Sequence, residues 1–248
     1  MTELKINGTA DRAEQPEVKI SETIEEYCEA IYNLTADGEG PVKSVHLADR
    51  MGVAAATVFA TIQRMQKSGL VMVDPHSHHI KLTETGEGIA LKLARRHSLL
   101  ERFLLDHLGL RWDEVHAEAC EMEHVLSTGV EEALNRYLGY PATCPHGNVI
   151  PGNGHVCPGD SRPLDQVEPG HRVKIVRVSE EGEHQAGLLR YLFQQGLVPG
   201  VHLEVKEKWT FDETITLVNN EQNEISLGRK TAHALWVSEE TSEPAPEK

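Results

Sequence analysis

The chain has 248 residues, which suits two or three small folded units, and a hydrophobic content of 39% allows them ordinary cores. No run of 18 or more apolar residues occurs and the first residues lack the pattern of a secretory signal, so we expect a cytoplasmic protein without a membrane association. The formal net charge of −15 argues against a nucleic-acid-binding surface over the whole molecule.

The charge is unevenly distributed along the chain. Residues 41–100 contain eight Lys or Arg side chains and only four Asp or Glu side chains, so this window is basic within an acidic protein. Such a window is typical of a surface that faces phosphates, while the acidic remainder would be repelled from DNA and would orient the basic face.

Residues 21–84 have the pattern of a winged helix-turn-helix. A first helix is predicted from Ser21, a residue type that caps helix N-termini, and it ends before Gly38 and Pro41. Two further helices at about 44–51 and 54–67 flank a tight turn at Gly52, and two β-prone runs around a proline predict a hairpin wing. This arrangement in a basic window predicts DNA binding, and residues 1–20 before it are expected to be disordered.

The segment from Trp112 to His124 carries the strongest chemical signal. Read as a helix, it has one stripe at spacings i, i+4, i+7 and i+8 that bears ligand groups instead of apolar ones: His116, Cys120, Glu123 and His124. The preceding long helix adds His97 and Glu101, one turn apart. Imidazole, thiolate and carboxylate are the groups with which proteins bind transition metals, so residues 85–140 are predicted to hold a metal site.

The last third of the chain changes character. Residues 141–164 are rich in Pro and Gly and are predicted to be a linker. Residues 165–237 contain short β-rich runs with a brief helical insert and predict a small β-barrel, and 238–248 form an acidic tail that we expect to be disordered.

Three other uses of these residues stay open at this point. The fragment E-x-x-H at 121–124 occurs in di-iron enzymes, but they need a second copy, which this sequence lacks, so we do not expect an enzyme. A cytosolic metal-storage or chaperone protein would leave the winged helix unexplained. The linker residues Cys144, His146, His155 and Cys157 have the composition of a zinc site, but the favoured interpretation is a loop in which these side chains are merely exposed.

The order of these features resembles the diphtheria toxin repressor and manganese transport regulator family of metal-dependent transcriptional regulators. The most specific motifs are E-Y-C-E-A-I-Y-N-L, R-R-H-S-L-L-E-R-F-L and V-H-A-E-A-C-E-M-E-H-V-L-S. The resemblance implies a mainly α N-terminal part, with a winged helix-turn-helix and a helical dimerisation domain, followed by a small all-β SH3-like barrel. It also implies a cytoplasmic homodimer that represses genes of metal homeostasis by binding a palindromic double-stranded DNA operator.

The resemblance implies two metal sites per subunit. The family's primary site maps onto Glu26, Cys120, Glu123 and His124, and its ancillary site onto His97, Glu101 and His116. Position 26 is a methionine in the iron-responsive branch, so the carboxylate found here favours Mn²⁺, with Fe²⁺ as the alternative because Cys120 is a softer ligand. Glu29 is expected to be a solvated neighbour, and the barrel residues Glu183, His184 and Gln185 are possible further ligands.

The predicted recognition helix departs from the family pattern because it is rich in small apolar residues. Such residues can contact thymine methyl groups but cannot hydrogen-bond base edges, so direct readout is expected to be modest, with more dependence on DNA shape. The residues predicted to face DNA are Ala54, Ala56, Thr57, Ala60, Thr61, Arg64 and Lys67.

Overall fold

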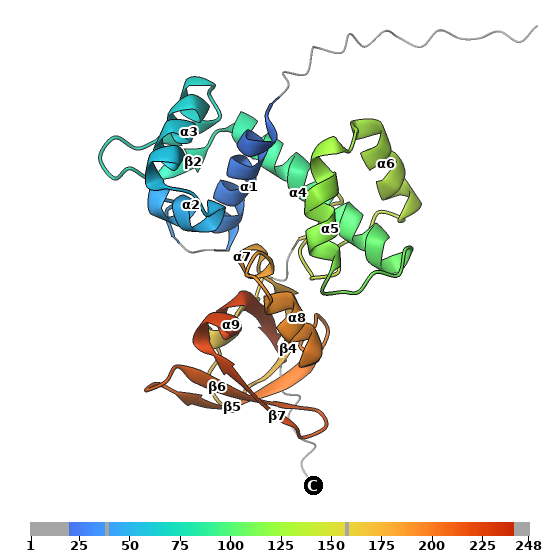
Figure 1. Ribbon diagram of the computed structural model, residues 1–248. Coiled ribbons are helices and arrows are strands. Elements are labelled where there is room, and N and C mark those ends of the chain that lie inside the picture. Colours follow the sequence, from blue (N-terminus) through green and yellow to red (C-terminus); the bar gives the residue numbers. More distant parts are fainter. Residues whose placement is uncertain (1–19, 38–39, 157–158, 241–248) are drawn as a thin grey trace, which may run out of the picture.

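A computed structural model describes residues 20–37, 40–156 and 159–240. Figure 1 shows three parts: an N-terminal helical unit with a small hairpin, a second group of helices, and a β-rich unit with short helices. The fold class predicted from the sequence is confirmed. Disorder was expected for residues 1–20 and 238–248, and of these, residues 1–19 and 241–248 lie outside the described residues.

The N-terminal unit is a winged helix-turn-helix. It consists of α1 (Glu22–Ala36), α2 (Ser44–Met51), α3 (Ala55–Lys67) and an antiparallel hairpin of β1 (Val71–Val73) and β2 (Ile80–Leu82). Gly52 ends α2 with φ of 62°, a left-handed conformation that glycine adopts at little cost, and this allows the sharp turn into α3. Apolar side chains of all three helices and the hairpin form one buried core, which includes Ile31, Leu47 and Met65.

Helix α4 (Glu84–Asp106) connects this unit to the second one. Its N-terminus is capped by the Thr83 hydroxyl, which accepts a hydrogen bond from the Gly86 N–H at 3.2 Å. Gly86 packs directly on the wing, because a Cβ atom at this position would lie 2.2 Å from the Leu70 carbonyl oxygen. The helix is therefore held closely against the DNA-binding unit at its start.

The second unit is formed by the rest of α4 with three shorter helices. These are α5 (Val115–Met122), the 3₁₀ helix η1 (Glu123–Val125) and α6 (Thr128–Tyr137). Leu100 and Leu104 of α4 pack on Val115 and Ala119 of α5 to form a small core of their own. The change from α to 3₁₀ geometry after Met122 alters the direction in which the following side chains point.

The Pro- and Gly-rich segment after α6 is ordered over most of its length. Cys144, His146 and Ile150 are buried, and the Arg102 guanidinium of α4 donates to the Thr143 carbonyl oxygen at 2.8 Å. Residues 141–152 therefore pack against α4 instead of serving as a free linker. The composition suggested a linker because it lacks helical or strand periodicity, but buried side chains and hydrogen bonds order the segment without either.

The C-terminal unit is a six-stranded antiparallel sheet with strand order β3-β8-β4-β5-β6-β7. Its strands are β3 (Arg162–Pro163), β4 (Arg172–Val178), β5 (His202–Trp209), β6 (Thr214–Asn219), β7 (Glu224–Gly228) and β8 (Leu235–Glu239). Alternate residues of β4, beginning with Val173 and Ile175, are buried in a core shared with Leu192 of the predicted helical insert. The sheet begins before residue 165 and extends past 237, so the β-rich unit is slightly longer than expected.

Short helices cover this sheet and connect it to the rest of the molecule. They are η2 (Leu164–Gln166), α7 (Glu180–Glu183), α8 (Leu188–Gln194) and α9 (Arg229–Ala234). Helix α7 lies between the sheet and the N-terminal unit (Figure 1). Two ion pairs join these units: Arg50 Nε to Glu181 Oε1 at 2.7 Å, and Arg177 Nη1 to Asp37 Oδ1 at 2.8 Å.

Within the described ranges, no single helix is long and apolar enough to cross a membrane. Helices α2 and α3 meet the length and composition criteria only when taken as a pair, and they are bent by 112° at their break.

Candidate metal centres and DNA-binding surface

Ligand-type side chains from five parts of the chain meet where the three units come together. They come from α1, α4, the α5–η1 segment, the ordered segment after α6, and α7. We describe them as an outer cluster (Glu26, Glu123, His124), an inner cluster (His97, Glu101, His116, Glu183) and a loop pair (Cys144, His146).

The outer cluster joins the DNA-binding unit to the second unit. His124 Nε2 lies 2.8 Å from Glu26 Oε1 on α1 and 3.6 Å from Glu123 Oε1, while its Nδ1 lies 2.8 Å from Glu25 Oε2. Burial opposes protonation, but the hydrogen bonds to Glu25 and Glu26 raise the pKa of His124. Carboxylate oxygens therefore lie on both sides of the His124 ring, and this concentration of negative charge suits a bound cation.

Cys120 lies away from the outer cluster in this structure. Its Sγ atom is 3.8 Å from His116 Nε2, and it groups with His97 and His116. The physical reason is the change from α to 3₁₀ geometry at Glu123, which separates the side chains that a continuous α-helix would align on one stripe. The primary ligand set expected from the resemblance is thus divided between two clusters.

The inner cluster is almost completely buried. His97 Nε2 lies 3.0 Å from both Glu101 Oε1 and His116 Nδ1, and His116 Nδ1 lies 3.1 Å from Glu183 Oε2. Burial alone would raise the pKa of Glu101, but the neighbouring His146 and His97 hold it well below its usual value. Sequence reasoning left Glu183 ambiguous because no periodicity fixes a residue of a four-residue helix.

His97 connects the two clusters. While its Nε2 faces the inner cluster, its Nδ1 lies 2.7 Å from Glu123 Oε2. Glu123 in turn presents its other oxygen to His124. One imidazole and one carboxylate therefore form a continuous path between the outer and the inner cluster.

The loop pair extends the inner cluster on its other side. His146 Nδ1 lies 3.0 Å from Glu101 Oε1 and 3.5 Å from Glu183 Oε2, and Cys144 groups with Glu101 and His146. The zinc site considered from the sequence combined these two residues with His155 and Cys157. His155 is exposed and Cys157 lies outside the described residues, so the structure gives the loop pair a different neighbour, Glu101.

Orphaned polar atoms show that the inner region fits a cation. Among the described residues, three buried ligand atoms lack a well-directed hydrogen bond: Glu101 Oε2, Glu183 Oε2 and His146 Nδ1. A buried carboxylate oxygen without a donor costs free energy, and a bound cation removes that cost. The donor set of carboxylates, imidazoles and a thiol is the set that transition metals use.

Glu29 is buried and not solvated as expected from the sequence. Its side chain is only 6% exposed, and burial together with the nearby Glu123 raises its pKa to about 8. Position 29 lies one turn from the partly exposed Glu25 and Glu26, and helical spacing alone does not distinguish the buried carboxylate from the others. The carboxyl group adds to the concentration of acidic groups between the two clusters.

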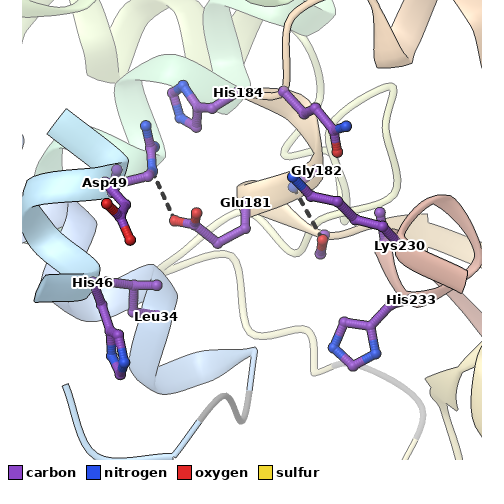
Figure 2. A pocket seen from close by; sticks show the side chains of 12 residues that line it. Leu34, His46, Asp49, Glu181, Gly182, His184, Lys230 and His233 are labelled. Atoms are coloured by element: carbon purple, nitrogen blue, oxygen red, sulfur yellow. Dashed lines mark hydrogen bonds and ion pairs between the residues drawn. The ribbon is translucent and has the colours of Figure 1, made fainter. Parts of the chain in front are cut away.

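A pocket lies between the DNA-binding unit and the β-rich unit, and its lining includes Arg50, Glu181 and Lys230. It encloses about 370 Å³, and Figure 2 shows Glu181 and His184 reaching into it from the region of α7. The His184 ring packs edge-on against His116, with ring centroids 4.6 Å apart. Burial, Arg50 and His116 hold the pKa of His184 well below its usual value, so this ring is neutral beside the cluster.

The predicted recognition helix α3 is exposed along one face. Six of the seven predicted DNA-facing residues have exposed side chains, whereas Thr61 is only 3% exposed. The Thr61 hydroxyl accepts a hydrogen bond from Arg64 at 3.4 Å, so it positions the arginine instead of facing DNA. Phe59, which was not predicted, is 60% exposed on the same helix.

Comparisons with known families match the chain in three consecutive parts. "Iron dependent repressor, N-terminal DNA binding domain" matches residues 19–79, "Iron dependent repressor, metal binding and dimerisation domain" matches 83–152, and "FeoA domain" matches 162–239. The second match ends at residue 152 and therefore includes residues 141–152, the segment that packs on α4.

Individual proteins match over most of the chain. The iron-dependent repressor IdeR of Mycobacterium tuberculosis is 35% identical over 230 residues, covering 88% of this chain and 98% of that protein. The diphtheria toxin repressor of Corynebacterium diphtheriae is 32% identical over 229 residues, covering 88% and 97%. A solved structure of a manganese-dependent transcriptional repressor in complex with manganese has a TM-score of 0.78 and 32% identity, covering 87% of this chain and 99% of that one.

Proposed function

Since this chain belongs to the iron-dependent repressor family of DNA-binding transcriptional regulators, we propose that metal bound at its two clusters controls its binding to an operator. The family consists of regulators and not enzymes, and it supports a homodimer as the DNA-binding form. Two recognition helices in one dimer favour a palindromic operator, with half-sites about one helical turn of DNA apart. A protein that binds an operator would act in the cytoplasm.

One observation carries this proposal: the residues of the outer cluster come from both the DNA-binding unit and the second unit. Glu26 belongs to α1 of the DNA-binding unit, whereas Glu123 and His124 belong to η1 of the second unit. An ion held by all three would fix the position of the DNA-binding unit relative to the dimerisation helices. Metal then favours DNA binding to the extent that it binds the arrangement competent for DNA more tightly.

We assign the first ion to Glu26, Glu123 and His124 and the second to His97, Glu101, His116 and Glu183. Cys120 lies beside His97 and His116, so its thiolate is a ligand for the inner side in this assignment. Without Cys120, the outer set contains two carboxylates and one imidazole, which are the harder donors that suit Mn²⁺. We therefore propose Mn²⁺ as the ion sensed at the outer cluster, with Fe²⁺ as the alternative.

The test is operator binding measured with and without metal. A DNA site is selected from a random library with the full-length protein in Mn²⁺, and its affinity is then measured after chelation and after addition of Mn²⁺, Fe²⁺, Co²⁺ or Zn²⁺. We expect a gain of about 30- to 150-fold with the activating ion, the range of an ordinary coupling energy. Equal affinity of the chelated and the loaded protein would reject metal control.

A further inference from the structure

We propose that the inner cluster and the loop pair together hold two metal ions that share the carboxylates of Glu101 and Glu183. This inference rests on the proposed function, because it takes the inner cluster to be a metal site. It adds an ion at the loop pair, so each subunit would hold three ions when the outer cluster is also filled.

The first support is that Glu101 belongs to two separate sets of ligand atoms. In one set it lies with His97, His116 and Glu183, and in the other with Cys144 and His146, each set having its ligand atoms within 4.8 Å of one another. Glu101 Oε1 is 3.0 Å from His97 Nε2 on one side and 3.0 Å from His146 Nδ1 on the other. A carboxylate between two groups of ligands is the arrangement that bridges paired ions about 3.5–4 Å apart.

Glu183 occupies a similar intermediate place. Its Oε2 atom lies 3.1 Å from His116 Nδ1 and 3.5 Å from His146 Nδ1. Its other oxygen accepts a hydrogen bond from the Asn148 amide, which leaves Oε2 as the atom directed between the two histidines. Both carboxylates are therefore positioned to bind an ion at the inner cluster and a second ion at the loop pair.

The orientation of the His146 ring is the second support. Its Nε2 lies 3.0 Å from the Trp112 carbonyl oxygen, which can only accept, so Nε2 carries a proton and Nδ1 is the ring atom directed at the carboxylate oxygens of Glu101 and Glu183. Histidine ligands of metals characteristically donate their second nitrogen to a carbonyl oxygen in this way.

Charge balance favours two ions over one. Glu101, Glu183 and a Cys144 thiolate would carry three negative charges in a region where all three side chains are at most 5% exposed. The Cys120 thiolate beside His97 and His116 adds a fourth negative charge, so two divalent ions balance the group and one leaves it negative, and uncompensated buried charge is costly. The loop pair, with its Cys144 thiolate, would prefer Zn²⁺, Co²⁺ or Fe²⁺, and the inner cluster, with more imidazole and carboxylate donors, also accepts harder ions.

The experiment counts and characterises ions in the full-length protein. Native mass spectrometry after equilibration with Co²⁺ is expected to find three ions per chain, and near-ultraviolet absorption should show thiolate-to-Co²⁺ charge transfer. Cys144→Ser should remove one ion and part of this absorption. Cys120→Ser is the matched control, and it should remove a different part of the absorption while the ion at the loop pair is retained.

Loading with Mn²⁺ gives a second, independent readout. Two ions sharing carboxylates should show an exchange-coupled pair by electron paramagnetic resonance in the wild type, and His146→Gln should convert the spectrum to that of isolated ions. Two ions per chain in the wild type, with no coupled pair, would overturn the shared centre even if operator binding still responds to metal. Three ions without any effect of metal on operator binding would leave the shared centre standing and reject the proposed function.

Discussion

At the scale of single residues, the proposed preference of the outer cluster for Mn²⁺ depends on Glu26. Its Oε1 lies 2.8 Å from His124 Nε2, and in the proposed assignment it is the ligand from the DNA-binding unit. Glu26→Met should shift activation from Mn²⁺ toward Fe²⁺ or Co²⁺, because a thioether replaces a hard charged donor. We expect the ratio of operator affinities in Mn²⁺ and Co²⁺ to change about tenfold, which corresponds to about 1.4 kcal/mol.

The matched control for this change is Glu22→Met on the same helix. Glu22 is exposed and lies outside the outer cluster, so the ion profile of this variant should equal that of the wild type. An unchanged profile for Glu26→Met at matched free metal concentrations would remove Glu26 from the ligand set and, with it, the preference for Mn²⁺.

Glu29 predicts how the metal-free protein responds to pH. Its pKa is about 8 in the folded protein, against an ordinary value of 4.5, so the folded state holds this proton more tightly than the unfolded state. The associated stability is complete below the ordinary value and is lost as pH rises through about 8. Glu29→Gln cannot lose a proton there, so in chelator its melting temperature should exceed that of the wild type increasingly between pH 6 and 8.5. A difference that stays constant over this range would contradict the burial of an ionisable group at this position.

Some features of the candidate site could be predicted from the sequence, and others could not. Helical spacing indicated His97, Glu101 and His116, because residues three or four apart share a face of a helix. It could not show that η1 is a 3₁₀ turn, that Cys120 groups with His97 and His116, or that Glu29 is buried. Those features depend on packing between elements that are distant in the sequence, and the ligand assignment itself stays a prediction.

At the scale of secondary structure elements, α7 connects the inner cluster to the helix-turn-helix. Glu183 of this short helix belongs to the inner cluster, and Glu181 forms the ion pair with Arg50 on α2. Restraining Glu183 therefore also restrains the position of α2. The sequence did not predict α7, since four residues are too few to show a periodicity.

Breaking this ion pair should weaken the effect of metal on DNA binding. The pair is only partly buried, and such pairs contribute roughly 0.2–1 kcal/mol. Glu181→Gln should therefore reduce the metal-dependent gain in operator affinity by a factor of about 1.5 to 5, with affinity in chelator unchanged. The exchange of both charges, Arg50→Glu with Glu181→Arg, should restore part of the gain, and an equal loss in the double variant would show that the ion pair is not the connection. Lys230→Gln, an exposed side chain in the same pocket, is the control.

At the scale of the whole molecule, the three-unit order and the fold class followed from the sequence. Strong apolar periodicity in the helices and alternation in the strands are local signals, and a chain can be read for them directly. The packing of residues 141–152 on α4 could not be read in this way, because its buried side chains follow no repeat. Its consequence is large, since this segment brings Cys144 and His146 to Glu101.

Metal should stabilise the whole molecule, because the proposed sites take ligands from all three units. An ion that binds only the folded state adds about 2.7 kcal/mol at a free concentration one hundred times its Kd. We expect Mn²⁺ to raise the melting temperature measured by calorimetry, and Glu101→Gln to remove much of this rise. The same temperature in chelator and in Mn²⁺ would mean that metal does not bind the folded state preferentially.

Helix α4 is long enough for a small change in its angle to cause a large displacement at its end. Its 23 residues span about 34 Å at 1.5 Å per residue, with the wing packed tightly on Gly86 at one end and His97 and Glu101 near the middle. A tilt of only about 5° at one end displaces the other by about 3 Å over this length. The major groove is about 12 Å wide, so a displacement of this size, repeated in both subunits, is enough to move two recognition helices out of register with their half-sites. A slight change of angle inside the molecule thereby becomes a large change at the surface of DNA.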